Sequence, residues 1–203
     1  MNQDKNSLID LVERIQRTNP DLLRVYGAKS EDEFDSAFLP ILEKAIIQLE
    51  KNKKNLASLK EEGLTAVFAS CFIGIGLTVT QETNSNGHVD LTIVADHCTP
   101  IRTKLGEAKI FRGFKYHISG LTQLIGLYTT GREGSGLLIE YVKKDGIKGL
   151  IEKLRKRMDK ELPLNQIDKS TAHIIKWSFL TAHKHSSGEN LTVQHISCNL
   201  YYE

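Results

Sequence analysis

Two acids and a lysine occupy neighbouring segments where their side chains could act together on a phosphate. Asp90 stands in the apolar run 89–94, a predicted β-strand, where a buried carboxylate is costly unless it is paired or bound to a metal. Glu107 and Lys109 follow in a second predicted strand, 103–111, and alternation places both side chains on one face. Carboxylate oxygens suit Mg²⁺, and a nearby lysine can orient a metal-bound water or balance phosphate charge. These residues predict a metal site for phosphate chemistry.

The charge of the chain is unevenly distributed. Residues 1–50 carry six Lys or Arg against ten Asp or Glu, whereas the rest of the chain carries 21 against 15. The net charge of the whole chain is only +2. Basic residues are concentrated at 101–120 and 141–160, which indicates contact with a polyanion or, for the second segment, a solvated helix face. The near-neutral total excludes tight binding of nucleic acid by bulk charge alone.

The first 55 residues predict a helical N-terminal extension. Apolar residues recur at helical spacing from Leu8 to Ile15, and a second helix opens with the capping-box pattern Ser30-Glu-Asp-Glu33. The predicted buried stripe of that helix is Phe38, Ile41, Leu42, Ala45 and Leu49. A third helix begins near Leu64 and ends near residues 74–76.

Residues 56–203 predict one α/β domain with a central mixed sheet flanked by helices. Strands are expected at 77–80, 89–94, 103–111, 136–142, 173–180 and 191–200, with a turn at 84–87. Helices are expected at 116–128 and 147–160. Trp177 and Phe179 in the strand 173–180 are expected in the core.

The spacing of the polar residues resembles that of the PD-(D/E)XK nucleases, the restriction-endonuclease-like superfamily. Asp90 and Glu107-Ala-Lys109 are separated by sixteen residues, and Gln123 follows on a predicted helix. The resemblance implies a restriction-endonuclease-like core in which Asp90 and Glu107 bind the metal, Lys109 is the catalytic lysine and Gln123 lies beside the active site. Val89 stands where the family name has proline.

The same resemblance implies a further acid from the preceding helix, either Glu61 or Glu62. With 100° per residue, Glu61 lies about 70° from the centre of the apolar face and Glu62 nearly opposite it, so we expect Glu61 as a third metal ligand. Tyr128 follows Gln123 by five residues, whereas the Gln-x-x-x-Tyr subgroup has four. Residues 191–200 are also similar to the end of nuclease domains in bacterial anti-phage defence systems.

These observations predict a metal-dependent nuclease, with DNA as the favoured substrate and endonuclease action in phage defence or restriction. The expected cofactor is Mg²⁺, with Mn²⁺ able to substitute. The alternative is a non-catalytic nuclease-fold subunit that binds a partner protein or nucleic acid. A separately encoded activating protein or a second copy of the chain is the expected partner.

A cytoplasmic location without membrane contact is expected, because the chain has no apolar run long enough to span a bilayer, no signal-peptide pattern and only three cysteines without a close pair. Four histidines are candidates for further contacts. His88 and His117 flank the predicted site in sequence, where either could contact a phosphate. His183 and His185 are expected to be solvated loop residues rather than metal ligands.

Overall fold

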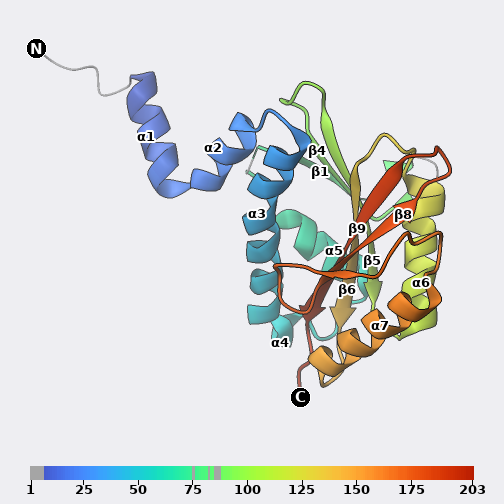
Figure 1. The fold of residues 1–203 in the computed structure, drawn as a ribbon. Helices are drawn as coiled ribbons and strands as arrows, with labels where there is room; N and C mark the ends of the chain where they lie inside the picture. The colour runs from blue at the N-terminus through green and yellow to red at the C-terminus, as the bar shows by residue number, and fades with distance from the viewer. Residues whose placement is uncertain (1–6, 75, 82, 85–87) are drawn as a thin grey trace, which may run out of the picture.

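The fold is an α/β arrangement in which helices cover a seven-stranded mixed β-sheet, as the order of elements predicts (Figure 1). The computed structural model describes residues 7–74, 76–81, 83, 84 and 88–203. Most of the turn predicted at 84–87 lies outside these residues, as does the side chain of His88. Within the described residues, no helix is long and apolar enough to cross a membrane.

The helices and strands have the following bounds. The helices are α1 (Leu8–Thr18), α2 (Pro20–Gly27), α3 (Glu31–Lys51), α4 (Lys53–Leu56), α5 (Glu61–Ser70), α6 (Phe114–Gln123), the π-helix η1 (Leu124–Tyr128) and α7 (Ile147–Glu161). The strands are β1 (Thr78–Thr80), β2 (Thr83–Asn84), β3 (His88–Val89), β4 (Leu91–Ala95), β5 (Arg102–Ile110), β6 (Ser135–Val142), β7 (Thr171–Ala172), β8 (Phe179–Lys184) and β9 (Asn190–Asn199).

The sheet has parallel strands at its centre and antiparallel strands at its edges. Its order is β1-β4-β5-β6-β9-β8-β7, and β5, β6 and β9 run parallel. Both strands predicted at 77–80 and 89–94 are present in part, and they pair antiparallel as β1 and β4. Helix α6 connects β5 to the parallel β6, as such a crossover requires. Strands β4 and β5 pair antiparallel, so Asp90, which directly precedes β4, lies beside β5.

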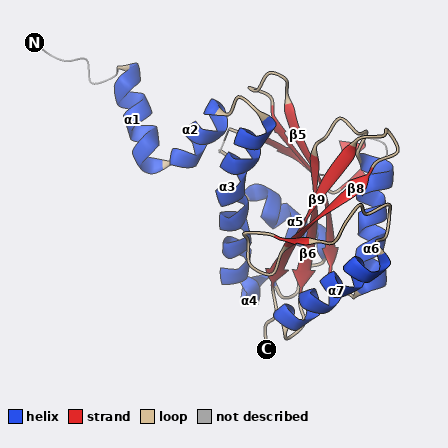
Figure 2. Cartoon of the chain, in the orientation of Figure 1, coloured by secondary structure: helices blue, strands red, loops and turns tan. Residues whose placement is uncertain are grey.

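Helices cover both faces of the sheet (Figure 2). Helices α3 and α5 pack on the face that carries Leu137, Ile139 and Tyr141 of β6. Helices α6 and α7 pack on the opposite face, against Leu138 and Val142 of the same strand. Alternation along β6 therefore feeds two apolar cores, which explains why this strand is buried throughout.

Helix α3 belongs to the core of the sheet. Its Ser30 cap accepts a hydrogen bond from Glu33 N, as the capping pattern predicts, and the Glu33 carboxylate accepts one from Lys29 N. The predicted stripe from Phe38 to Leu49 is confirmed, because all five of its residues are buried. By contrast, α1 has no buried residue and projects from the body of the molecule (Figure 1).

Two basic residues of the segment 101–120, Arg102 and Lys104, form ion pairs with acids of α3, whereas Arg112 and Lys115 are exposed. Lys104 is fully buried on β5, where it forms ion pairs with Glu31 and Asp35 of α3. Arg102 also pairs with Glu31, at 3.0 Å. The excess acid of the N-terminal segment and the excess base of this segment therefore neutralise each other in part. The reason is that β5 lies inside the sheet, so its side chains face packed helices.

Three predicted elements differ from the structure. The strand 89–94 is interrupted, because Asp90 forms a bend between β3 and β4. The helix 116–128 begins at Phe114 and ends in the π-helix η1. The strand 173–180 is replaced by the short β7, an irregular stretch and then β8, and Trp177 has a left-handed backbone with φ of 58°. Phe179 is buried as predicted, whereas Trp177 is only half-buried.

Candidate active site between β4, β5 and α5

Asp90 is held against β5 by a hydrogen bond to its backbone. The Asp90 Oδ2 atom accepts from Ala108 N at 2.9 Å. The bend at Asp90 turns the carboxylate toward the neighbouring strand, where an unbroken strand would point it perpendicular to the sheet. Asp90 is partly exposed, so solvent reaches the site from its side.

Glu107 and Lys109 lie on one face of β5, as alternation predicts, and form an ion pair. Glu107 is fully buried, and 12% of the Lys109 side chain is exposed. Neither carboxylate oxygen of Glu107 accepts a hydrogen bond of normal geometry from the described residues. A buried carboxylate with unused acceptor capacity is costly, which makes Glu107 the unusual member of the site.

Glu61 is placed at the open end of β5 by the first turn of α5. Its Oε2 atom accepts from Ile110 N at 2.8 Å and lies 3.5 Å from the Tyr116 hydroxyl. Its Oε1 atom lies 3.5 Å from Lys109 Nζ. The neighbouring Glu62 is exposed. Of the two acids that the sequence offered, Glu61 is thus the one that faces the site.

Burial and like charge perturb the ionisable groups. The pKa of Glu107 is raised to about 7, first by burial and then by the charge of Asp90, against the lowering effect of Lys109. The pKa of Lys109 is raised, because Glu107, Glu61 and Asp90 together outweigh burial, which alone would lower it. Lys109 is therefore an ammonium at neutral pH, with the acidic residues Glu107, Glu61 and Asp90 around it.

Helix α6 packs closely on β5 at the site. This is possible because Gly120, at the contact, has no side chain. A Cβ atom at this position would lie 3.1 Å from Lys109 Cγ and 3.3 Å from Glu107 Cγ. It would also lie 3.1 Å from the side chain of Leu138. The close approach of the helix therefore fixes the side chains of the two β5 residues.

Gln123 ends α6 and is half-buried, and its side chain has no hydrogen bond with any described residue. Tyr128, at the end of η1, is buried beside Glu107, and its pKa is raised by burial first and by the charge of Glu107 second. In a π-helix the hydrogen bond spans five residues, as Thr129 N shows with Leu124 O at 3.1 Å. The five-residue spacing from Gln123 to Tyr128 thus corresponds to about one turn, as four residues do in an α-helix.

The site offers a hard cation two carboxylate ligands rather than three. Within the described residues, no group of three His, Cys, Asp or Glu side chains is arranged to hold a metal ion. Asp90 and Glu107 are the best pair, since they are close enough for the charge of Asp90 to raise the pKa of Glu107, and neither Glu107 oxygen accepts a hydrogen bond of normal geometry from the described residues. One or two carboxylates with waters are the usual protein ligands of Mg²⁺. Glu61 is engaged with Ile110 N and Lys109.

A buried chain of histidines lies beside the site, and the sequence did not reveal it. Glu140 on β6 pairs in register with Lys109, and its Oε1 atom lies 2.6 Å from His117 Nδ1. The other ring nitrogen of His117 lies 3.0 Å from His195 Nδ1. The expectation that His117 could contact a phosphate is wrong, because it is buried and both ring nitrogens are engaged.

The chain continues through β8 to a backbone carbonyl. Thr181 Oγ1 lies 2.7 Å from Nε2 of both His195 and His183, and His183 Nδ1 lies 3.0 Å from Leu164 O. The expectation of solvated histidines at 183 and 185 is wrong, because both are buried where β8 packs beside β9.

The terminal carbonyl fixes the direction of the hydrogen bonds from Leu164 as far as His117. Leu164 O can only accept, so His183 donates from Nδ1 and accepts at Nε2 from Thr181, because burial lowers the pKa of His183. Thr181 then accepts from His195, whose pKa is lowered well below normal, first by burial, so that its Nδ1 accepts from His117. His117 Nε2 therefore carries a proton.

One more proton lies between His117 Nδ1 and Glu140. It makes either an imidazolium with a carboxylate or a neutral histidine with a carboxylic acid, and the pair is neutral in both forms. Burial raises the pKa of Glu140, and the hydrogen bond from His117 opposes that shift. The second oxygen, Glu140 Oε2, is buried without a hydrogen-bond partner among the described residues. The pair thus adds no net charge beside Lys109.

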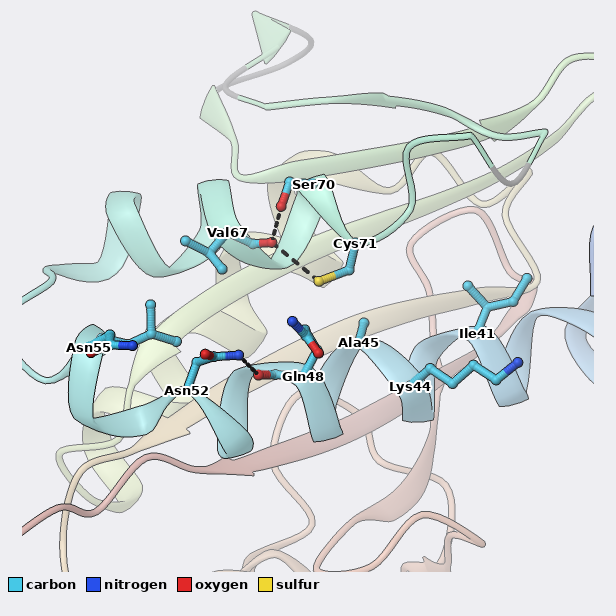
Figure 3. A pocket seen from close by; sticks show the side chains of 10 residues that line it. Ile41, Lys44, Ala45, Gln48, Asn52, Asn55, Val67, Ser70 and Cys71 are labelled. Atoms are coloured by element: carbon cyan, nitrogen blue, oxygen red, sulfur yellow. Dashed lines mark hydrogen bonds between the residues drawn. The ribbon is translucent and has the colours of Figure 1, made fainter. Parts of the chain in front are cut away.

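A separate groove of about 630 Å³ lies between α3 and α5 (Figure 3). Its polar lining includes Gln48, Asn52 and Cys71, but part of it is used within the helices themselves. Asn52 donates to Gln48 O at 2.8 Å, and Cys71 lies 3.4 Å from Val67 O. The groove contains no acid of the site described above, so we do not assign it to the chemistry.

The fold and the site together define an α/β protein with two carboxylates and a lysine on adjacent strands. Comparison with protein-family models, curated proteins and solved structures gives no match. The function must therefore be argued from the geometry of the side chains.

Proposed function

We propose that the protein is a metal-dependent nuclease with a restriction-endonuclease-like core, and that DNA is its favoured substrate. The observation that supports this most is the convergence of Asp90, Glu107 and Lys109 from two adjacent strands, with Glu61 at the open end of β5. Hydrolysis of a phosphodiester needs positive charge near the phosphoryl oxygens and a positioned water. This arrangement is suited to both.

Each residue has a distinct role in the proposal. Asp90 and Glu107 would hold Mg²⁺ or Mn²⁺, which when bound polarises a phosphoryl oxygen and lowers the pKa of a coordinated water. Lys109 would donate hydrogen bonds to a phosphate oxygen or to the water, since its raised pKa keeps it protonated. Glu61 would hold Lys109 in place and accept from the Ile110 amide.

A nuclease assay tests the proposal directly. Purified protein is incubated with Mg²⁺ or Mn²⁺ and with single-stranded DNA, duplex DNA or RNA, and EDTA samples serve as blanks. The variants Asp90→Asn, Glu107→Gln and Lys109→Met should each lose activity by about 100-fold or more, as expected for loss of electrostatic stabilisation. Glu61→Gln should lose less, and Glu62→Gln is the matched control because Glu62 is exposed.

The outcomes separate the nuclease from the alternative. Cleavage that survives in Asp90→Asn and Lys109→Met would refute the mechanism. Calorimetric titration with Mn²⁺ gives a second measure, because a nuclease of this kind must bind the ion through Asp90 and Glu107. Nucleic-acid binding without any metal binding or cleavage would favour a non-catalytic subunit. A role in phage defence, with a separately encoded activator, would be tested by co-purification from the native cell.

A further inference from the structure

A hollow beside α7 combines aromatic rings with cations. It has a volume of about 540 Å³ and lies between the N-terminal half of α7 and residues 176–179. Its lining includes Trp177, which is half-buried, and Phe179, which is almost fully buried. The charged residues among its described lining are Lys148, Arg155, Lys176 and Glu152. The hollow therefore has an apolar aromatic surface and an excess of positive charge.

The Trp177 ring is presented by an unusual backbone. A bulky residue rarely adopts positive φ, and here φ is 58°. The ring is half-buried, and Lys176 Nζ lies 4.9 Å from its centroid, an arrangement in which the π face already attracts a cation. A tryptophan in the core would be fully buried, whereas Trp177 is half-buried and lines an open hollow.

Arg155 is held in a defined orientation by Ser170. Its Nε atom donates to Ser170 Oγ at 2.7 Å, and Nη2 donates to Ser170 O at 2.9 Å. Ser170 is itself fixed, because its N–H donates to Asp159 at 2.6 Å. The guanidinium therefore keeps a defined orientation while the remaining N–H groups are free to donate elsewhere. Lys148 lies seven residues before Arg155, about two turns away on the same face of α7.

The floor of the hollow is in register with the candidate active site. Glu107 pairs across the sheet with Leu138, Leu138 with His195, and His195 with Phe179. The Phe179 ring stacks on His195 at 4.2 Å between centroids. Three strand spacings separate Glu107 from Phe179, a distance of about 14 Å.

We propose that this hollow binds an unpaired nucleotide of a single-stranded nucleic acid, with the base stacked on Trp177 and the phosphates contacted by Lys148, Arg155 and Lys176. Aromatic rings combined with a cationic groove are the usual means of binding single strands. An acidic peptide would use the cations but not the ring. The binding stands on the hollow alone, whereas its interpretation as a contact to the substrate strand rests on the proposed nuclease function.

The chain has one tryptophan, so its own fluorescence reports occupancy of the hollow. The wild-type protein is titrated in EDTA, where no metal-dependent cleavage occurs, with a 12-nucleotide oligothymidylate, a duplex of equal length and polyglutamate. We expect quenching by the single strand and none by the duplex or polyglutamate. Absence of quenching by the single strand, or equal quenching by polyglutamate, would overturn the proposal.

Variants test the residues by anisotropy of a labelled oligonucleotide. Trp177→Ala should weaken binding by about 10-fold or more, the usual effect of losing one stacked base. Lys148→Ala should weaken it by several-fold and is an exposed change that leaves folding intact. Lys153→Ala is the matched control, because Lys153 is an exposed lysine on the same helix outside the hollow. Equal weakening by the control would mean that charge alone is responsible, and would refute the site.

The two proposals fail separately. Quenching without cleavage in Mg²⁺ or Mn²⁺ would leave the nucleotide site and remove the nuclease. Cleavage without quenching would leave the nuclease and remove the nucleotide site.

Discussion

Glu140 and His117 share one proton in a fully buried pair, with Glu140 Oε1 2.6 Å from His117 Nδ1. The pair is neutral whichever residue holds that proton, because the rest of the histidine chain fixes the direction of the other hydrogen bonds. Glu140 pairs in register with Lys109, so the pair lies beside the site. Because the pair is neutral, it does not alter the net charge there.

The first prediction follows from this neutrality. Glu140→Gln should lose only about 1 kcal/mol of unfolding free energy, because the amide N–H can donate to neutral His117. Glu140→Ala should lose about 3 kcal/mol, because it leaves a buried ring nitrogen unpaired and opens a cavity. Urea unfolding at pH 7 measures both. Equal losses in the two variants would contradict the shared-proton pair.

The second prediction concerns Gly120, where α6 meets β5. Gly120→Ala gains about 1 kcal/mol from helix propensity but loses about 1–3 kcal/mol from overpacking, so stability should change little or fall slightly. Nuclease activity should fall by about 10-fold or more, because a displacement of the reacting groups by a fraction of an ångström is costly. Gly149→Ala on α7 is the control, since a Cβ atom there meets nothing within 4 Å. Full activity in Gly120→Ala would show that α6 does not position the two side chains.

The third prediction is a pH dependence of stability from Glu107. Its folded-state pKa of about 7 lies above the ordinary value of 4.5, so the folded state binds the proton more tightly. The stability that this provides is complete below pH 4.5 and is lost as pH rises through 7, a loss of about 3 kcal/mol. In EDTA, the unfolding free energy of Glu107→Gln minus that of the wild type should therefore increase from pH 4.5 to pH 8. The increase should approach about 3 kcal/mol. A constant difference across that range would contradict the raised pKa.

The fourth prediction concerns the N-terminal segment. Deletion of residues 1–18 should shift the Tm by only a few degrees, because α1 has no buried residue. Deletion of residues 1–55 should prevent folding, because it removes the buried face of α3 and leaves Lys104 buried without Glu31 and Asp35. Circular dichroism and thermal unfolding measure both. A folded 56–203 fragment would show that α3 is dispensable to the sheet.

The geometry around β5 was largely predictable from the sequence, and the histidine chain was not. Alternation along one strand is enough to place Glu107 beside Lys109, and helical angles alone separate Glu61 from Glu62. The partners His117 and His195 lie 78 residues apart, and their contact depends on β9 inserting between β6 and β8. No local sequence pattern predicts this order of strands in the sheet. Lys104 shows the same limit, since a charged residue in a strand gives no sign that acids from α3 will cover it.

The π turn at 124–128 has a consequence for the position of the Tyr128 ring. One extra residue between Gln123 and Tyr128 would rotate the ring away from Glu107 in a continuous α-helix, but the wider turn absorbs it. Insertion of a single residue is therefore compatible with an unchanged position of the ring.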